Sequence, residues 1–207
     1  MNRQNIWNFW AKYYDRLWLQ QFSLQPTRAL VCQRIAAKAE EQGCLNILDM
    51  GCGTGQQYGD LIQALGEEQF EYLGIDQSSI MISKAQEKFP QADFIQSDVL
   101  QAKPRQAPFD LIICSHSFPY YEEGKAALAS MVALLKPDAS LLLTQACTEG
   151  LYDSILLKLT GLTTSTACYR SSPQMLELGK VHFRQAQVLP VSEQRFIPSL
   201  LLFHWQR

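Results

Sequence analysis

The stretch Asn46–Gly55 reads NILDMGCGTG and decides the fold. An apolar run ends in Asp49, and residues 57–65 beyond the stretch have the pattern of a helix. Between them come glycines at alternate positions: Gly51, Gly53 and Gly55. A strand, a glycine turn and a helix in this order build a cofactor site at the carboxyl end of the first strand of an open α/β sheet. A glycine-rich turn without a ligand is the alternative, and Asp49 with a second acid downstream favours the ligand site.

The second acid is Asp76, at the end of the short β-type run Glu71–Ile75. It follows Gly55 by about twenty residues, the spacing expected between a glycine turn and a ribose-binding acid. A carboxylate can accept hydrogen bonds from two ribose hydroxyls, and charged acceptors form stronger bonds than neutral ones. A solvated turn aspartate and the N-cap of a helix near Ser78 are the alternatives, and we favour ribose binding.

The composition fits one globular domain with a sizeable core, because 47% of the 207 residues are hydrophobic and 18% are charged. The formal net charge of −2 gives no reason to expect electrostatic capture of a nucleic acid or an acidic membrane. The six cysteines include no C-x-x-C pair and no Cys/His spacing of a zinc site, so we expect no metal. The first residues are polar and no apolar run is long enough to cross a membrane, so we expect a cytoplasmic protein without stable membrane insertion.

Uninterrupted apolar runs separated by helical segments predict a parallel sheet. We expect strands at 71–75, 92–96, 109–114 and 139–145, and two closing, antiparallel strands at 185–191 and 199–205. Further helices are expected at 27–41, 78–89, 122–135 and 150–159. Residues 161–173 lack periodicity and are expected to form a mobile loop. An N-terminal helix with an aromatic stripe could pack on the domain or cover an active site; the stripe consists of Trp7, Trp10, Tyr14, Leu17 and Trp18.

Taken together, five ordered segments resemble the class I S-adenosylmethionine-dependent methyltransferase family. They are Leu48–Gly55, Gly74–Asp76, Gln96–Val99, Phe109–Ile112 and Leu134–Pro137. Within that family the chain is similar to the small-molecule methyltransferases of the ubiquinone/menaquinone-biosynthesis type, over roughly residues 28 to 146. The resemblance implies an α/β fold of the Rossmann-like, doubly wound type, with a seven-stranded, mostly parallel sheet, an antiparallel C-terminal strand and helices on both faces.

The resemblance also implies a single methyltransferase domain over residues 1–207. Residues 1–25 would form the aromatic helix or lid, 26–146 the cofactor-binding core, and 147–207 the substrate side and the closing strands. The cofactor would be S-adenosyl-L-methionine, with S-adenosyl-L-homocysteine as product.

Cofactor-binding roles follow from the same resemblance. The glycines would admit the amino-acid and ribose portions, Asp49 would order the turn or reach the ammonium group, and Asp76 would hold the ribose. Asp98 would accept a hydrogen bond from the adenine amino group, and Val99 would offer its backbone N–H. The remaining predicted contacts are Cys52 in the turn, Gln77 and Met81 beside the adenine, Cys114 and Ser115 beside the methionine moiety, and Tyr13 from the N-terminal helix.

The reaction requires in-line placement of a nucleophile, and it requires a base only where the nucleophile must lose a proton. His116 follows the fourth strand and has an ordinary pKa suited to that task, so it is the candidate base. A loop histidine with local hydrogen bonds is the alternative. Tyr14, Tyr120 and Tyr121 could line the acceptor pocket, whose apolar and aromatic surroundings suit a small or medium-sized organic molecule, with an O, N or C nucleophile, rather than a nucleic acid.

Two other interpretations remain open. A dinucleotide-binding oxidoreductase would need G-x-G-x-x-G, but the sixth position from Gly51 is Gln56 and the third glycine comes one place early. A protein that binds the cofactor without turnover would keep the same glycine turn and acids. The sequence is compatible with either a monomer or a homodimer.

Overall fold

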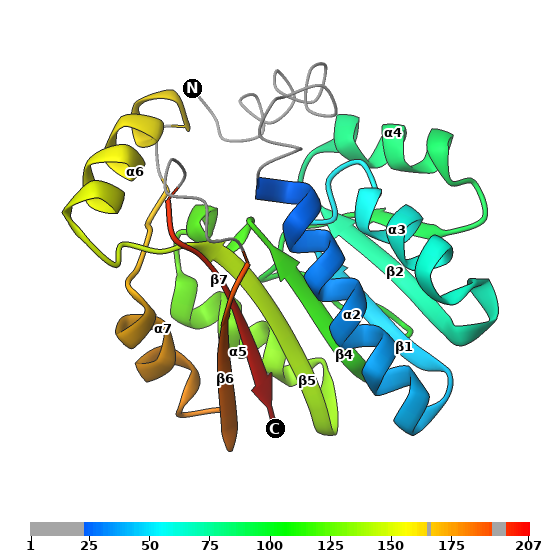
Figure 1. Ribbon diagram of the computed structural model, residues 1–207. Coiled ribbons are helices and arrows are strands. Elements are labelled where there is room, and N and C mark those ends of the chain that lie inside the picture. Colours follow the sequence, from blue (N-terminus) through cyan, green and yellow to red (C-terminus); the bar gives the residue numbers. More distant parts are fainter. Residues whose placement is uncertain (1–22, 165–166, 192–197) are drawn as a thin grey trace.

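A mixed sheet of seven strands, in the order β3-β2-β1-β4-β5-β7-β6, forms the centre of the molecule (Figure 1). The computed structural model describes residues 23–164, 167–191 and 198–207. Within these ranges the strands are β1 (Leu45–Met50), β2 (Phe70–Asp76), β3 (Asp93–Gln96), β4 (Phe109–Ser115), β5 (Leu135–Ala146), β6 (Gln185–Pro190) and β7 (Leu200–Gln206). The first five strands pair in parallel, and β7 runs antiparallel to both β5 and β6. The predicted fold class is therefore confirmed.

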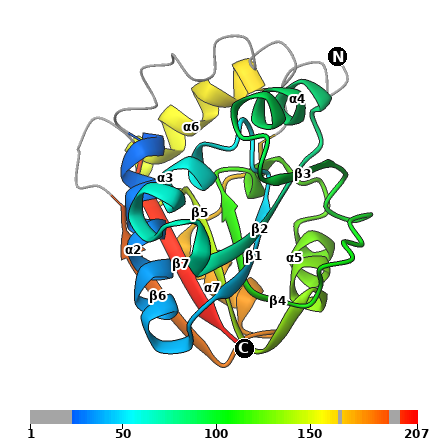
Figure 2. The same ribbon diagram turned by 90° about the vertical axis from the view of Figure 1, so that its right-hand side faces the viewer.

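Helices cover both faces of the sheet (Figure 2). The described helices are α2 (Gln25–Gln42), α3 (Gln56–Leu65), α4 (Ser79–Lys88), α5 (Gly124–Ala133), α6 (Leu151–Thr164) and α7 (Ser172–Gly179), with 3-10 turns η3 (Glu67–Gln69) and η4 (Phe118–Tyr120). Apolar side chains of α2, α3 and α4 pack in one layer, and those of α5 and α7 pack in the other. None of the described helices is long and apolar enough to span a bilayer.

Side chains of strand β5 pack against the helices on both faces of the sheet. Successive side chains of a strand point to opposite faces. Leu141 and Leu143 accordingly pack with α5, whereas Leu142 packs with α2, and all three are fully buried. A strand covered on both sides must be apolar along its whole length, which is the pattern seen in the sequence.

The strand order changes direction between β1 and β4. From β1 the chain proceeds outward through β2 to β3, and from β4 it proceeds the other way to β5. The carboxyl ends of β1 and β4 therefore diverge into connections on opposite faces, and open α/β sheets bind ligands in the crevice at such a point.

Several predicted boundaries need correction. The helix expected to reach residue 135 ends at Ala133, because Leu135 pairs with Phe109 and begins β5. Helix α6 extends to Thr164, and α7 begins at Ser172, so the loop expected over 161–173 is wrong at both ends. The predicted N-terminal aromatic helix, including Tyr13 and Tyr14, lies outside the described residues.

Helix α7 was not expected from the sequence, although its start is marked. Ser171 and Gln174 form a capping box, in which each side chain accepts a backbone hydrogen bond at the helix start, and Pro173 occupies the first turn. The capping box is not distinctive in the sequence, because the serine-rich residues around it are also typical of loops.

Candidate functional site

The glycine turn after β1 adopts a conformation that its glycines make possible. The φ angles are +85° at Gly51, +56° at Gly53 and +75° at Gly55, all in the region that L side chains rarely adopt. A Cβ on Gly51 would lie 2.4 Å from Cβ of Ser117, and one on Gly55 would lie 2.9 Å from the ring of Phe94. The conformation of the turn is therefore fixed by its backbone geometry and by the close packing of Ser117 and Phe94 against its glycines.

Asp76 at the end of β2 holds this turn. Its Oδ2 accepts a hydrogen bond from the Gly53 N–H at 3.0 Å, and its Oδ1 accepts one from the Ser78 N–H at 2.8 Å. Burial raises the pKa of Asp76, and backbone hydrogen bonds from Ser78, Gly53 and Gln77 act against that rise. A carboxylate has about four lone-pair positions, so acceptor capacity remains for further donors.

Asp49, the last acid of β1, is only 2% exposed. Its Oδ2 accepts a hydrogen bond from the Tyr72 hydroxyl at 2.7 Å. Burial raises the pKa of Asp49 to about 7, the Tyr72 hydrogen bond lowers it, and the charge of Asp76 raises it further. A cation bound beside Asp49 would favour its ionised form and lower this raised pKa.

Residues from β1 with its glycine turn, from the end of β4 and from the helices α2 and α3 line a pocket at the point where β1 and β4 diverge. Strand β1 contributes Asp49, and the turn after it contributes Gly51, Cys52 and Thr54. The end of β4 contributes Ser115 and His116. Helix α2 with its N-cap contributes Leu24, Thr27 and Arg28, and α3 contributes Gln56 and Gln57. The structure therefore brings together five of the predicted site residues: Asp49, Gly51, Cys52, Ser115 and His116.

His116 has a positive φ of 58°, which is unusual for a residue with a side chain. Its backbone N–H donates to the Thr144 carbonyl at 2.8 Å, which anchors the strained residue to β5. Its Nε2 lies 2.9 Å from Oγ1 of Thr27, and that hydroxyl donates its proton to the Ser23 carbonyl at 2.8 Å. Thr27 can therefore only accept from the ring, so the proton of the neutral ring is on Nε2 and Nδ1 is a proton acceptor.

The environment keeps this histidine neutral. Burial lowers its pKa to about 4, and the positive charge of Arg28 adds to the effect. At neutral pH the ring is therefore an uncharged base, weaker than a solvent-exposed histidine.

Arg28 is the cation among the described residues that line the pocket, and no motif in the sequence points to it. Its Nε donates to Asp60 of α3 at 2.5 Å, and its Nη1 donates to Oε1 of Gln56 at 2.7 Å. These contacts join the first turns of α2 and α3 and hold the guanidinium beside the glycine turn. The only sequence signal was its place just after Pro26, in the first turn of a helix, which does not by itself indicate a ligand.

At the end of β4, alternate residues face opposite sides. The Oγ of Ser115 is buried and has no hydrogen-bond partner among the described residues, although Ser115 lines the pocket. Cys114 is fully buried in the layer of α5, and its Sγ lies 3.2 Å from Oγ of Ser117. Ser117 donates to the Met50 carbonyl at 2.9 Å and accepts from the Tyr121 hydroxyl at 3.1 Å. Ser117 and Tyr121 thus support the turn from below.

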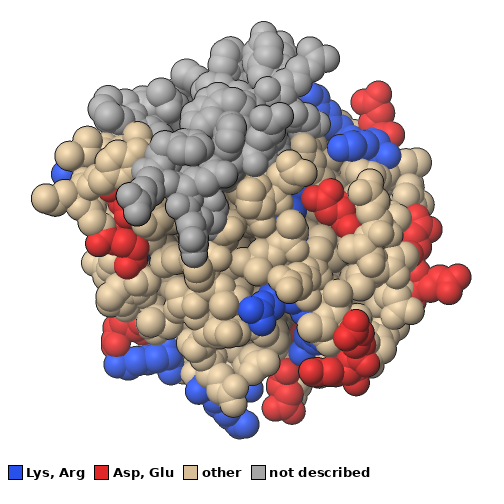
Figure 3. All heavy atoms as spheres, viewed as in Figure 1, with Lys and Arg blue, Asp and Glu red and all other residues tan. Residues whose placement is uncertain are grey.

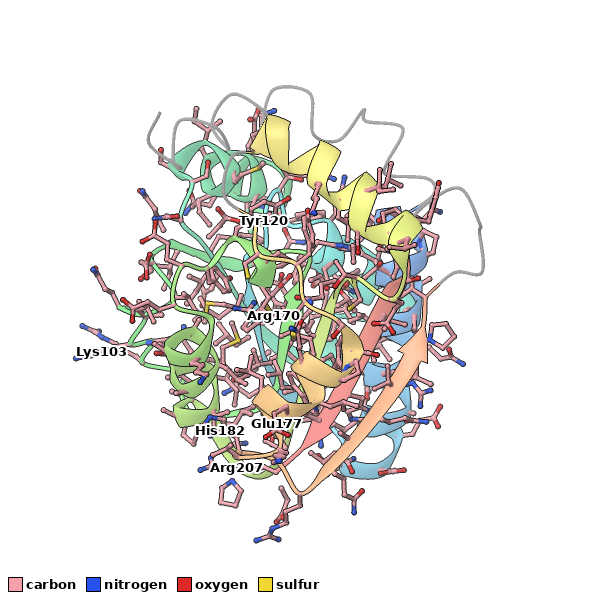
Figure 4. The ribbon with its side chains drawn as sticks, turned by 90° about the vertical axis from the view of Figure 1, so that its left-hand side faces the viewer. Lys103, Tyr120, Arg170, Glu177, His182 and Arg207 are labelled. Carbon is pink, nitrogen blue, oxygen red and sulfur yellow. The ribbon has the colours of Figure 1, made fainter. Side chains whose placement is uncertain are left out.

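Tyr120 occupies a different position from Tyr121. Its hydroxyl lies 3.3 Å from that of Tyr169. Figure 4 shows Tyr120 toward the end of the molecule that carries α6, with Arg170 nearer the middle. The guanidinium of Arg170 lies 5.5 Å from the ring centre of Phe118, a cation–π contact that holds the segment after residue 166 against η4.

The remaining predicted residues gather beyond β2 and β3. Asp98 is half-buried; its Oδ1 accepts from the Leu100 N–H at 2.8 Å, and Nε2 of Gln77 lies 3.5 Å from its Oδ2. Met81 and Val99 are both buried, at 2% and 6% exposure, so their side chains pack in the interior. No group of three or more His, Cys, Asp and Glu side chains that could hold a metal ion occurs in the described ranges.

Comparison with known proteins gives one family and several relatives. The family described as "Methyltransferase domain" matches residues 47–138. The chain is 27% identical over 124 residues to the trans-aconitate 2-methyltransferase of Acidovorax sp. (strain JS42), which covers 60% of this chain and 46% of that protein. It is 25% identical over 169 residues to a ubiquinone/menaquinone biosynthesis C-methyltransferase of Campylobacter jejuni, which covers 72% of this chain and 70% of that protein.

A solved structure extends this likeness to the whole fold. The magnesium protoporphyrin IX methyltransferase from Synechocystis PCC 6803 with bound SAH superposes with a TM-score of 0.75 at 21% identity and 100% coverage of both chains. At this identity the match shows a shared fold. The chain spans less than half the length of the trans-aconitate 2-methyltransferase that it matches.

Proposed function

We propose that this chain is a class I S-adenosylmethionine-dependent methyltransferase that transfers the methyl group of S-adenosylmethionine to a small or medium-sized organic acceptor. The match of the methyltransferase domain to residues 47–138 supports this proposal, and so do the methyltransferases named above. The observation that carries the proposal is the bond between Asp76 and the Gly53 N–H, which ties the ribose-binding candidate to the glycine turn. The residues with positive φ angles in the turn are glycines, which carry no side chain that could block a ligand.

The charges of the pocket fit the amino-acid end of this cofactor. That end carries an ammonium group and a carboxylate, and the pocket presents Asp49 and Arg28. An ammonium group beside Asp49 would offset the burial that raises its pKa, and Arg28 can bind a carboxylate with the N–H groups of its planar fork. The Oγ of Ser115, which is buried and has no partner in the part of the chain that the structure describes, offers a further hydrogen bond in the same pocket.

The adenosine end would extend toward β2 and β3. Asp76 would receive the ribose hydroxyls on its remaining lone pairs. Asp98 and the backbone N–H of Val99 would bind the adenine edge, with Gln77 and Met81 beside the ring. Met81 is already buried, so it would support the ring from below rather than move to meet it.

The bound cofactor supplies a sulfonium methyl group that is electrophilic without further activation. The protein must then hold the acceptor in line and exclude water, and alignment of this kind is worth on the order of 7 to 11 kcal/mol in favourable cases. Where the acceptor must lose a proton, Nδ1 of His116 would take it, because Nε2 is committed to Thr27. The proton would pass from the acceptor atom to Nδ1 as the acceptor atom bonds to the methyl carbon and the methyl–sulfur bond breaks, and S-adenosylhomocysteine would be the leaving group.

The acceptor would enter beside His116 and η4. Tyr120 is the last residue of η4 and Tyr121 follows it, and both are half-buried. Tyr13 and Tyr14 keep their proposed cofactor and acceptor roles as predictions. The relatives named above act on small molecules by their names, which supports an acceptor of that class, with an O, N or C atom as nucleophile. All six cysteines are free, which supports a reducing, cytoplasmic location.

Calorimetry with two ligands tests this assignment part by part. S-adenosylhomocysteine contains the whole scaffold except the methyl group, whereas 5′-methylthioadenosine lacks the amino-acid end. Arg28→Gln should weaken S-adenosylhomocysteine at least tenfold and leave 5′-methylthioadenosine unchanged. Gly53→Val should abolish binding of both, since it fills the turn and forces a side chain to φ +56°. Equal loss of both ligands in Arg28→Gln would reject the carboxylate role, and unchanged affinity in Gly53→Val would reject the glycine assignment.

A binding protein without turnover is the second candidate, because every contact above serves binding. Turnover of S-adenosylmethionine with a panel of phenols, quinols, amines and carboxylic acids separates the two. Product formation supports the enzyme, and tight binding without turnover across the panel supports the binding protein. An NAD-binding oxidoreductase would instead show NAD affinity in the same calorimeter.

A further inference from the structure

A second cavity lies between α2 and the strands β5, β6 and β7, near the end of the sheet where the parallel strands begin. Its lining includes Arg34 and Lys38 from α2, Ser140 from β5 and His204 from β7. The register pairs Leu142 with His204, and Leu142 packs in the layer of α2, so these side chains share that face of the sheet. Figure 3 looks onto this face, where blue Lys and Arg atoms and red Asp and Glu atoms both reach the surface.

The cavity wall contains polar atoms that the protein leaves unsatisfied. Nε of Arg34, Oγ of Ser140 and Nε2 of His204 are buried and have no hydrogen-bond partner in the described part of the chain. Ser140 itself is 0% exposed. Buried polar groups are almost always paired, so three orphaned atoms around one cavity indicate a missing polar occupant.

The charge of the wall favours an anion. Arg34 and Lys38 are half-buried, and neither forms a salt bridge within the described ranges. Burial lowers the pKa of His204, and the charges of Arg34 and Lys38 lower it further, which places both cations near the ring. The charges of Asp110, Glu41 and Asp138 do act on Lys38. The lining nevertheless carries four basic side chains, Arg34, Lys38, Arg184 and Arg207, against two acidic ones, Glu41 and Asp138.

We propose that this cavity binds an oxyanion of the phosphate class, with Arg34 and Lys38 supplying charge and Ser140 and His204 supplying hydrogen bonds. Ordered water could satisfy the orphaned dipoles, but it would not balance the excess of basic over acidic side chains in the lining. The cavity shares no lining residue with the pocket at the glycine turn, so anion binding here does not depend on the proposed methyl transfer.

Nuclear magnetic resonance of ¹⁵N-histidine-labelled protein reads the two sites separately, because the chain has three histidines. His116 lines the first pocket and His204 the second, and the variant His204→Gln assigns the second ring. Inorganic phosphate should shift the His204 ring signals with a saturating curve and leave those of His116 in place, whereas sodium chloride at equal ionic strength should shift neither. A phosphate monoester that binds at least tenfold tighter than phosphate would identify a phosphorylated metabolite as the ligand, and equal binding would identify the free ion.

Variants tie the signal to the cavity. Arg34→Gln should raise the dissociation constant for phosphate at least tenfold, and Ser140→Ala should raise it severalfold while altering only one buried atom. Arg105→Gln, an exposed arginine outside the cavity, is the matched control and should bind as the wild type does. The proposal is overturned if phosphate moves His204 no more than chloride does, or if Arg105→Gln weakens binding as much as Arg34→Gln.

Discussion

The Nε2 atom of His116 lies 2.9 Å from the hydroxyl oxygen of Thr27, and this contact joins the end of β4 to the first turn of α2. Because Thr27 donates to the Ser23 carbonyl, the contact fixes which ring nitrogen carries the proton. The candidate base and its positioning residue therefore come from segments 89 positions apart in the chain.

His116→Ala should lower turnover about a hundredfold or more, the usual contribution of a general base, if the acceptor must lose a proton. Its affinity for S-adenosylhomocysteine should stay near the wild-type value, since the ring serves the acceptor. Steady-state kinetics and calorimetry measure the two quantities. Unchanged turnover with the true acceptor would leave His116 as a loop residue.

Thr27→Val should lower kcat about tenfold, because the ring loses one orienting hydrogen bond. Thr27→Ser keeps the hydroxyl and should restore most of the rate. A valine variant as active as the wild type, or a serine variant as slow as the valine variant, would show that the contact does not orient the base.

Protonation of His116 should destabilise the fold in acid. Its folded pKa of about 4 lies below the ordinary value of 6.5, so its contribution to stability is complete above pH 6.5 and is lost as the pH falls toward 4. The difference corresponds to on the order of 3 kcal/mol. His116→Gln should therefore lose less stability than the wild type between pH 7 and pH 5 in denaturant titrations. Parallel curves for the two proteins would contradict the buried, neutral histidine.

The titration of Asp49 should change the stability of the fold with pH in the opposite direction to that of His116. Its folded pKa of about 7 lies above the ordinary 3.8, so the folded protein holds a proton that the unfolded chain releases, and stability falls as the pH rises from about 4 to 7. Asp49→Asn removes this penalty and should melt at a higher temperature than the wild type at pH 8, with a smaller difference at pH 5.

The same substitution should weaken binding of S-adenosylhomocysteine, because it removes the charge proposed to meet the ammonium group. A gain in stability with a loss of affinity is the trade-off expected at a functional site. An Asp49→Asn protein that melts lower than the wild type at both pH values would show that the carboxylate is needed for the fold.

Gly51→Ala tests the packing beneath the turn. The added Cβ would meet Ser117 at 2.4 Å at a residue with φ +85°. Gly43→Ala is the matched control, because Gly43 also has a positive φ of +79° but no atom within 4 Å of the added Cβ. We expect Gly51→Ala to lower the free energy of unfolding by about 1 to 3 kcal/mol more than Gly43→Ala does, the usual cost of overpacking. Equal losses would mean that Ser117 moves aside freely.

The sequence predicts the fold well where local and long-range signals agree. The run before Asp49 is apolar because β1 is covered on both faces, and Gly51 follows because only glycine tolerates Ser117 beneath it. Constraints of this kind determine the residue type at single positions, so they can be recognised in the sequence. The boundary between α5 and β5 cannot be recognised in this way, because it depends on the pairing of Leu135 with Phe109, which lies in another strand.

The site is predicted less completely than the fold. Asp49, Asp76 and His116 stand out because their chemistry and their positions after strands are visible in the chain. Arg28 and Thr27 do not stand out, since a helix start far from the glycine turn gives no hint that it will face the same pocket. The neutral state of His116 is likewise invisible in the sequence, because burial by the folded chain produces it.

Titration calorimetry of S-adenosylhomocysteine against the wild type and Asp76→Ala tests the central claim most directly, with Asp93→Ala, an exposed acid on β3, as the control. The account predicts micromolar binding to the wild type and to Asp93→Ala, and a loss of about 1.5 to 3 kcal/mol in Asp76→Ala, the value of hydrogen bonds to a charged group. Equal affinity of Asp76→Ala and the wild type would contradict the ribose role, and the absence of binding to the wild type would contradict the cofactor assignment itself.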